Sequence, residues 1–227
     1  MANSLKERIA QQDPRYVLLS NEEKRRQLTQ EIAVFIGAAA FMQPDVLIYL
    51  DKSSRPISWV VNRVWKSTFP AIKKPETKFM NFGREKSIVN DLVGETGKPR
   101  LSLSLRGKEE LKTSAELFRQ EYGNRSAGTY LDGKSLWLVD EVSQTGSSLT
   151  AAKIIITEAL SDKLPEPIFT HTVLSSEPIW YRDNWMIGVD DNTYNMDTLL
   201  SVAAINNNGA QLRGELRAVA DDIIAQY

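Results

Sequence analysis

Short apolar runs alternate with stretches of helical periodicity along most of the chain. Residues 46–50, VLIYL, form a continuous apolar run, which is typical of a strand covered on both faces, and the run ends at Asp51. Pro56 suits the first turn of a helix. Apolar residues follow it at helical spacing: Ile57, Val60, Val61, Val64 and Trp65. Residues 46–66 therefore predict a strand, a polar loop and a helix.

The rest of the chain repeats this alternation. Four further strands are predicted, at 78–82, 135–142, 167–174 and 185–189. Helices are predicted between and after them, at 108–122, 147–160, 196–204 and 210–225. Strands that alternate with helices predict an α/β fold of the Rossmann-like, three-layer kind, with a central, mainly parallel sheet between helices.

An amphipathic helix precedes the first strand. Its apolar face is formed by Leu28, Ile32, Phe35, Ile36 and Ala39. We therefore divide the chain into an N-terminal helical extension at 1–43 and an α/β domain at 44–227 that ends in helices. The extension could cover the sheet or meet a second subunit in a homodimer. Outside its helix, the segment 83–134 is rich in Gly, Arg, Lys and Ser, and we predict that it is mobile.

Composition narrows the classes of function. The chain has 28 basic and 29 acidic residues, so it carries no excess of positive charge for a nucleic-acid backbone, and we expect no nucleic-acid partner. The absence of cysteine excludes disulfides and thiolate metal sites, and a single histidine disfavours a zinc site. The chain contains no signal-peptide core and no apolar run of about 18 residues. We expect a cytoplasmic protein without a membrane partner.

Two adjacent carboxylates stand at the end of the strand predicted at 135–142. They are Asp140 and Glu141, and the turn 145–148, TGSS, leads from them into the next helix. A helix start favours an anion, Gly146 lets the backbone approach it, and the hydroxyls can donate to phosphate oxygens. Carboxylates would repel that phosphate unless they face another part of the ligand, such as paired ribose hydroxyls, which are donors. The combination predicts a sugar phosphate as the ligand.

The segment 136–148, LWLVDEVSQTGSS, resembles the signature of the type I phosphoribosyltransferases: an apolar strand, two acids and a glycine within a Thr/Ser-rich turn. The resemblance implies that Asp140 and Glu141 hold the ribose hydroxyls of phosphoribosyl pyrophosphate (PRPP). It implies that the 5′-phosphate is cradled by Ser143, Gln144, Thr145, Gly146, Ser147 and Ser148. The segment departs from the usual family pattern at four positions, which are Trp137, Glu141, Ser143 and Gln144.

A second loop that suits an anion lies at 51–55, DKSSR, between the first strand and its helix. It offers two cations and two hydroxyls beside a helix start. In the resembling family the corresponding loop binds pyrophosphate, which implies substrate binding by Asp51, Lys52, Ser53, Ser54 and Arg55. In the alternative interpretation, Asp51 or Ser54 only caps the helix and Lys52 is solvated.

A third segment, 182–191, is similar to the part of purine phosphoribosyltransferases in which an aromatic residue three positions before a glycine stacks on the base. Trp185 has that spacing, although it could equally be a core residue. A downstream acid in that family lies near the metal. Here Asp191 stands one residue early, and Asn192 occupies the expected place. The implied cofactor is Mg²⁺, held mainly through substrate oxygens and water.

Two classes of function follow from these features. The first is an enzyme of nucleotide metabolism: a Mg²⁺-dependent glycosyltransferase that moves phosphoribose from PRPP onto a nitrogenous, purine-like base. Lys52 and Arg55 would then neutralise the leaving pyrophosphate, while Asp140 and Glu141 would orient the ribose. The second is a non-catalytic module of the same fold that senses PRPP or a nucleotide. His171 lies within a predicted strand and is expected to be structural.

Overall fold

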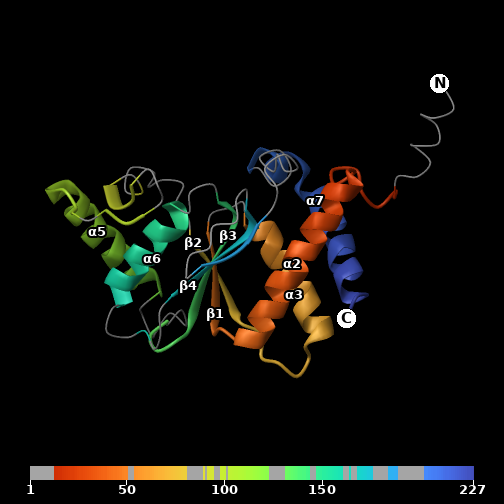
Figure 1. The fold of residues 1–227 in the computed structure, drawn as a ribbon, viewed down its shortest axis with the longest axis horizontal. Coiled ribbons are helices and arrows are strands. Elements are labelled where there is room, and N and C mark those ends of the chain that lie inside the picture. The colour runs from red at the N-terminus through yellow and green to blue at the C-terminus, as the bar shows by residue number, and fades with distance from the viewer. Residues whose placement is uncertain are drawn as a thin grey trace.

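The described part of the chain is an α/β fold in which one sheet separates two layers of helices (Figure 1). The computed structural model describes residues 13–50, 54–80, 89, 91–94, 98–100, 102–122, 131–143, 147–160, 164, 168–175, 184–188 and 202–227. No helix in these ranges combines the length and the apolar character needed to cross a membrane.

The sheet has five strands in the order β2-β1-β3-β4-β5. The strands are β1 (Val46–Leu50), β2 (Glu76–Met80), β3 (Leu136–Ser143), β4 (Phe169–Ser175) and β5 (Asn184–Gly188). Each strand is parallel to its neighbours. All five carboxyl ends therefore lie at one edge of the sheet, which is the edge where open parallel sheets bind ligands. The predicted mainly parallel sheet is confirmed.

Two sets of helices cover the two faces of the sheet (Figure 1). One face packs against α2 (Glu22–Met42), α3 (Arg55–Thr68) and α7 (Val202–Ile224), and the other against α5 (Leu105–Tyr122) and α6 (Ser147–Leu160). Alternate strand residues supply the two cores because successive side chains of a strand point to opposite faces. The apolar run predicted to be covered on both faces is buried throughout.

Strands β1 and β3 lie side by side, but the chain leaves them towards opposite faces. After β1 it enters α3 on one face, and after β3 it enters α6 on the other. Such a divergence is a topological switch point, and in sheets of this kind the ligand binds at the carboxyl ends of the two diverging strands. The topology therefore selects the ends of β1 and β3 as the place for a site.

The C-terminal helix differs from the sequence-based prediction of two helices, at 196–204 and 210–225. The structure has one continuous helix, α7, that passes through Gly209 and Gly214. Its buried face comprises Leu212, Leu216, Val219, Ala220 and Ile223. Packing of this face against α2 and α3 outweighs the poor helix propensity of glycine. Residues 196–201 lie outside the described ranges.

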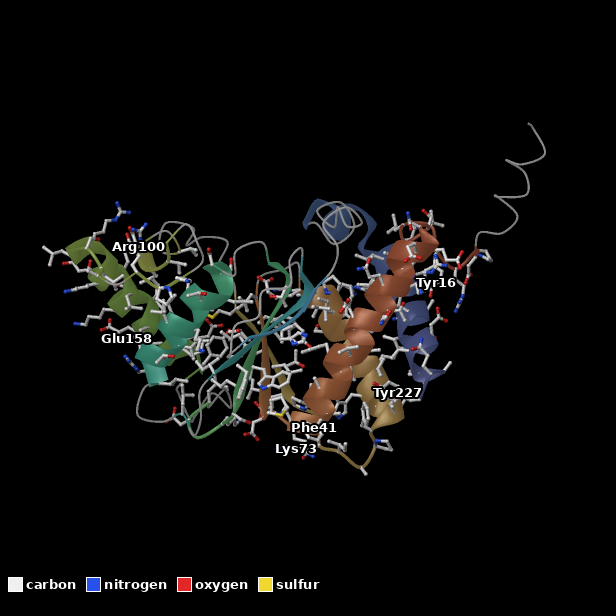
Figure 2. All side chains as sticks on the ribbon, viewed as in Figure 1. Tyr16, Phe41, Lys73, Arg100, Glu158 and Tyr227 are labelled. Carbon is white, nitrogen blue, oxygen red and sulfur yellow. The ribbon has the colours of Figure 1, made fainter. Side chains whose placement is uncertain are left out.

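The segment before the first strand shares a core with the sheet. Buried Glu215 of α7 accepts hydrogen bonds from the backbone N–H groups of Val17, Leu18 and Leu19 at 3.0, 2.9 and 2.7 Å. At the other end of α7, the ring of Tyr227 packs edge-on against Phe69, 5.4 Å between centroids, beside α3 (Figure 2). Helix α7 therefore ties the N-terminal segment to the α/β core.

Candidate functional site

The end of β1 and the acidic end of β3 lie at the same level of the sheet. Tyr49 is paired with Val139, so the next residues, Leu50 and Asp140, lie level with each other. Asp140 is also paired with Thr172 of β4. The loop that leaves β1 therefore begins beside Asp140.

Asp140 is half-buried, and its place in β3 puts it on the side of the sheet that α6 covers. Leu136 and Leu138 belong to the core under α5 and α6, and every second side chain of a strand points to the same face. Glu141 and Ser143 complete the strand. The positions between the strand and α6, which are Gln144, Thr145 and Gly146, lie outside the described ranges.

Helix α6 begins at Ser147, where the sequence predicts it. Ser147 and Ser148 form its first turn and are partly buried. This turn contains no acidic residue, so nothing in it opposes an anion at the positive end of the helix. This first turn lies at the same sheet edge as Asp140, and the positive end of a helix favours a bound anion.

The loop after β1 enters α3 through Ser54, which is fully buried. Its hydroxyl donates a hydrogen bond to the carbonyl oxygen of Leu50, and it makes no side-chain capping bond to the described amides of α3. Ser54 therefore occupies the N-cap position of α3 without a side-chain capping bond, because its hydroxyl is turned back to the strand. Asp51, Lys52 and Ser53 lie outside the described ranges.

Arg55 is exposed at the first position of α3, and it reaches over to β2. Its guanidinium carbon lies 5.2 Å from the centroid of the Phe79 ring. Stacking on an aromatic face leaves the N–H edge of a guanidinium group able to bind an anion. The first turn of α3 contains no acid that would compete for Arg55. Phe79 was not identified from the sequence, since only strand pairing brings it beside Arg55.

Trp185 is the second residue of β5 and is paired with His171. Its backbone is thus level with Val139, one step below Asp140 and three residues before the end of the strand at Gly188. Asp191 lies outside the described ranges. Among the described residues no group of three or more acidic or histidine side chains could hold a metal, so magnesium stays a prediction that depends on the substrate.

His171 lies in the core between the sheet and α2. It is 2% exposed, and its ring stacks on that of Trp137 at 6.3 Å and lies 4.6 Å from that of Phe35. Burial lowers the pKa of His171 to about 3, which keeps the ring neutral at physiological pH. This environment agrees with the expectation that the histidine is structural.

The described geometry defines the class of the protein. It is an α/β protein with an open, parallel sheet that has one topological switch point, between β1 and β3. The chain gives no significant match to a protein-family model, to a curated protein or to a solved structure. The resemblance to type I phosphoribosyltransferases therefore depends on the sequence of the segments 51–55, 136–148 and 182–191, and it stays a prediction.

Proposed function

We propose that the protein binds PRPP together with Mg²⁺ and transfers the phosphoribosyl group to a nitrogenous, purine-like base in the cytoplasm. One observation carries the proposal: the starts of α3 and α6 lie at the switch point between β1 and β3, beside Asp140. Two helix starts can receive two phosphate groups, and a carboxylate next to them can accept hydrogen bonds from sugar hydroxyls.

PRPP has the charge distribution that this arrangement would complement. Its 5′-phosphate would bind to the first turn of α6, through backbone N–H groups and the hydroxyls of Ser147 and Ser148. Its pyrophosphate would lie at the start of α3, within reach of Arg55 and Lys52. Asp140 and Glu141 would accept hydrogen bonds from the two ribose hydroxyls between these ends.

Catalysis at such a site would be largely electrostatic. The bond between the anomeric carbon and the pyrophosphate oxygen breaks, pyrophosphate departs with the electron pair, and a ring nitrogen of the base forms the new bond and loses its proton. Arg55 and Lys52 would stabilise the charge on the departing pyrophosphate, and Asp140 would favour the positive charge that develops on the sugar. Bound Mg²⁺ supplies further neutralisation of the pyrophosphate oxygens.

The second candidate is a non-catalytic module of the same fold that senses PRPP or a nucleotide. Departures from the family signature at Glu141, Ser143 and Gln144 favour it. The departure at Trp137 does not, because this side chain is 4% exposed and packs in the core against Phe169. A bulky residue at that strand position fills the core and leaves the carboxyl end of the strand unaffected.

Pyrophosphate release separates the two candidates. The protein is incubated with PRPP, Mg²⁺ and a panel of purine and pyrimidine bases, and released pyrophosphate is measured. Release that depends on one base supports the transferase. A rise in Tm with PRPP but no release with any base supports the sensor, and the absence of any PRPP effect on Tm refutes both.

The acidic pair can be tested directly with the double variant Asp140→Asn, Glu141→Gln. Hydrogen bonds to charged groups contribute about 1.5–3 kcal/mol each, so PRPP affinity should fall by roughly 100-fold or more, with the far-UV CD spectrum unchanged. The matched control, Glu22→Gln with Glu23→Gln, alters an adjacent acidic pair exposed at the start of α2 and should bind PRPP normally. Normal PRPP affinity in the Asp140/Glu141 variant would contradict the assignment.

A further inference from the structure

A groove of about 800 Å³ lies between α3 and α7. These two helices pack against each other on the face of the sheet opposite to α5 and α6 (Figure 1). The lining of the groove includes Trp59, Arg63 and Lys66 from α3, and Arg213, Leu216 and Arg217 from α7. The α3 residues recur at helical spacing, as do those of α7, so each set forms one face of its helix. Two helices separated by most of the sequence thus build one surface.

The groove is strongly basic. Four of its side chains are cationic, and none of the described residues that line it is acidic. Arg63 donates to Asp221 at 2.8 Å, whereas Lys66, Arg213 and Arg217 form no ion pair with any described residue. Gathered like charges repel one another, and a bound anion would relieve that repulsion. The surplus positive charge therefore indicates an anionic ligand.

Helix stability explains only part of this charge. Lys66 lies in the last turn of α3, where a cation interacts favourably with the helix dipole. Arg213 and Arg217 lie inside α7, well before its end at Ile224, and have no such effect to account for them. Both are exposed, and an uncharged helix former would serve the helix equally well.

One of the arginines is held in place by an aromatic ring. The guanidinium carbon of Arg213 lies 4.7 Å from the centroid of the Trp59 ring, and Trp59 is itself half-buried. A guanidinium group stacked in this way loses little freedom on binding and keeps its N–H edge directed at an anion, which it can contact through two parallel bonds. The pair forms a preorganised phosphate receptor.

We propose that this groove binds a small polyphosphate, either inorganic or the phosphate chain of a nucleotide, through Arg213, Arg217 and Lys66. Its volume lies within the range of about 300–1,000 Å³ that is usual for small-molecule sites. Lys66 is eleven residues from Arg55, about 16 Å along α3, so the groove leads away from the sheet edge. The site is thus separate from the one proposed for PRPP and does not depend on it.

Calorimetric titration of the full chain with tripolyphosphate and with ATP, in low salt, tests the proposal. We expect both ligands to bind, with an affinity that falls as salt is added and that drops at least tenfold in Arg213→Gln, Arg217→Gln. Glutamine keeps part of the side-chain stem, and both positions are exposed, so the fold should be retained and Tm should change by only a few degrees, through loss of the stacking of Arg213 on Trp59. Equal affinities for tripolyphosphate and ATP would show that the protein contacts only the phosphate chain. Tighter binding of ATP would show that the nucleoside contributes to affinity.

Two controls locate the anion. Lys108→Gln with Lys112→Gln removes two exposed cations from α5 and should leave binding unchanged. The Asp140/Glu141 variant should also bind polyphosphate normally, even if it has lost PRPP. The proposal is overturned if neither polyphosphate binds the wild type at millimolar concentration. Binding of single-stranded RNA without binding of either polyphosphate would be one such result. It is equally overturned if the arginine variant binds like the wild type, or if the control variants lose binding as well.

Discussion

The two faces of the sheet are built from the same strands but bury different chemistry. The face under α5 and α6 is packed mainly with aliphatic side chains, such as Ile48 and Leu138 of the strands and Ile155 of α6. Among the described residues, the buried carboxyl and imidazole groups all lie on the other side, with α2, α3 and α7. The buried groups whose ionisation should make stability depend on pH therefore lie on the second face.

Part of this difference follows from the way in which the helices are layered on each face. On the α5/α6 side, the helices lie directly on the sheet, and the contacts between helices and sheet are made mainly by apolar side chains. On the other side, α7 packs against α2 and α3, and the N-terminal segment packs against α7. Loop backbone buried in this second interface requires hydrogen-bond partners, which Glu215 supplies. Polar burial on this face is thus partly a consequence of covering irregular backbone.

The largest effect on stability is expected from Glu215→Ala. Its carboxylate accepts three backbone hydrogen bonds, and leaving the N–H groups of Val17, Leu18 and Leu19 without this partner should lower the free energy of unfolding by about 3 kcal/mol or more. Urea denaturation measures the change. Glu116→Ala, an exposed position on α5, is the matched control and should change stability by less than about 0.5 kcal/mol. Equal midpoints for the two variants would show that the N-terminal segment is not anchored by α7.

Glu31→Gln should give a smaller change that depends on pH. Glu31 is 7% exposed, and burial raises its pKa to about 7. Between about pH 4.5 and 7 the folded state keeps a proton that the unfolded state releases, so stability is lost as the pH rises through this window. Glutamine removes the loss, and at pH 8 the variant should be more stable than the wild type by up to about 3 kcal/mol. A difference of equal size at pH 4 and pH 8 would contradict this origin.

His171→Leu should have the smallest effect at neutral pH, below about 1.5 kcal/mol, because the two side chains are similar in volume. Neither ring nitrogen of His171 has a hydrogen-bond partner among the described residues. The folded state disfavours protonation, so stability falls as the pH drops from about 6.5 towards about 3, by up to about 1.4 kcal/mol per pH unit. The variant should lose this acid sensitivity, which denaturation at pH 7.5 and pH 5 would reveal. An unchanged acid slope would assign the sensitivity to other groups.

Much of the fold could be predicted from local patterns. The strand at 46–50 and the helix that begins at Ser147 lie where they were predicted. Burial of a strand on both faces requires a continuous apolar run, and a helix start favours particular residue types, so both features can be recognised from neighbouring residues. The edge strand β2 was predicted two residues late, since its side chains are mostly partly exposed and carry a weak pattern. Of the candidate site, the sequence indicated Asp140, Ser147 and Arg55, and the structure brings their elements to one edge.

The sequence by itself determined where most of the strands and helices lie, because periodicity and turn chemistry act over a few neighbouring residues. Only the tertiary structure decided the strand order, and with it the switch point that brings the ends of β1 and β3 together. It also decided that Phe79 supports Arg55, that Trp59 supports Arg213 and that α7 is one helix. These pairings depend on how buried surfaces fit between segments far apart in the chain, and no local pattern records that fit.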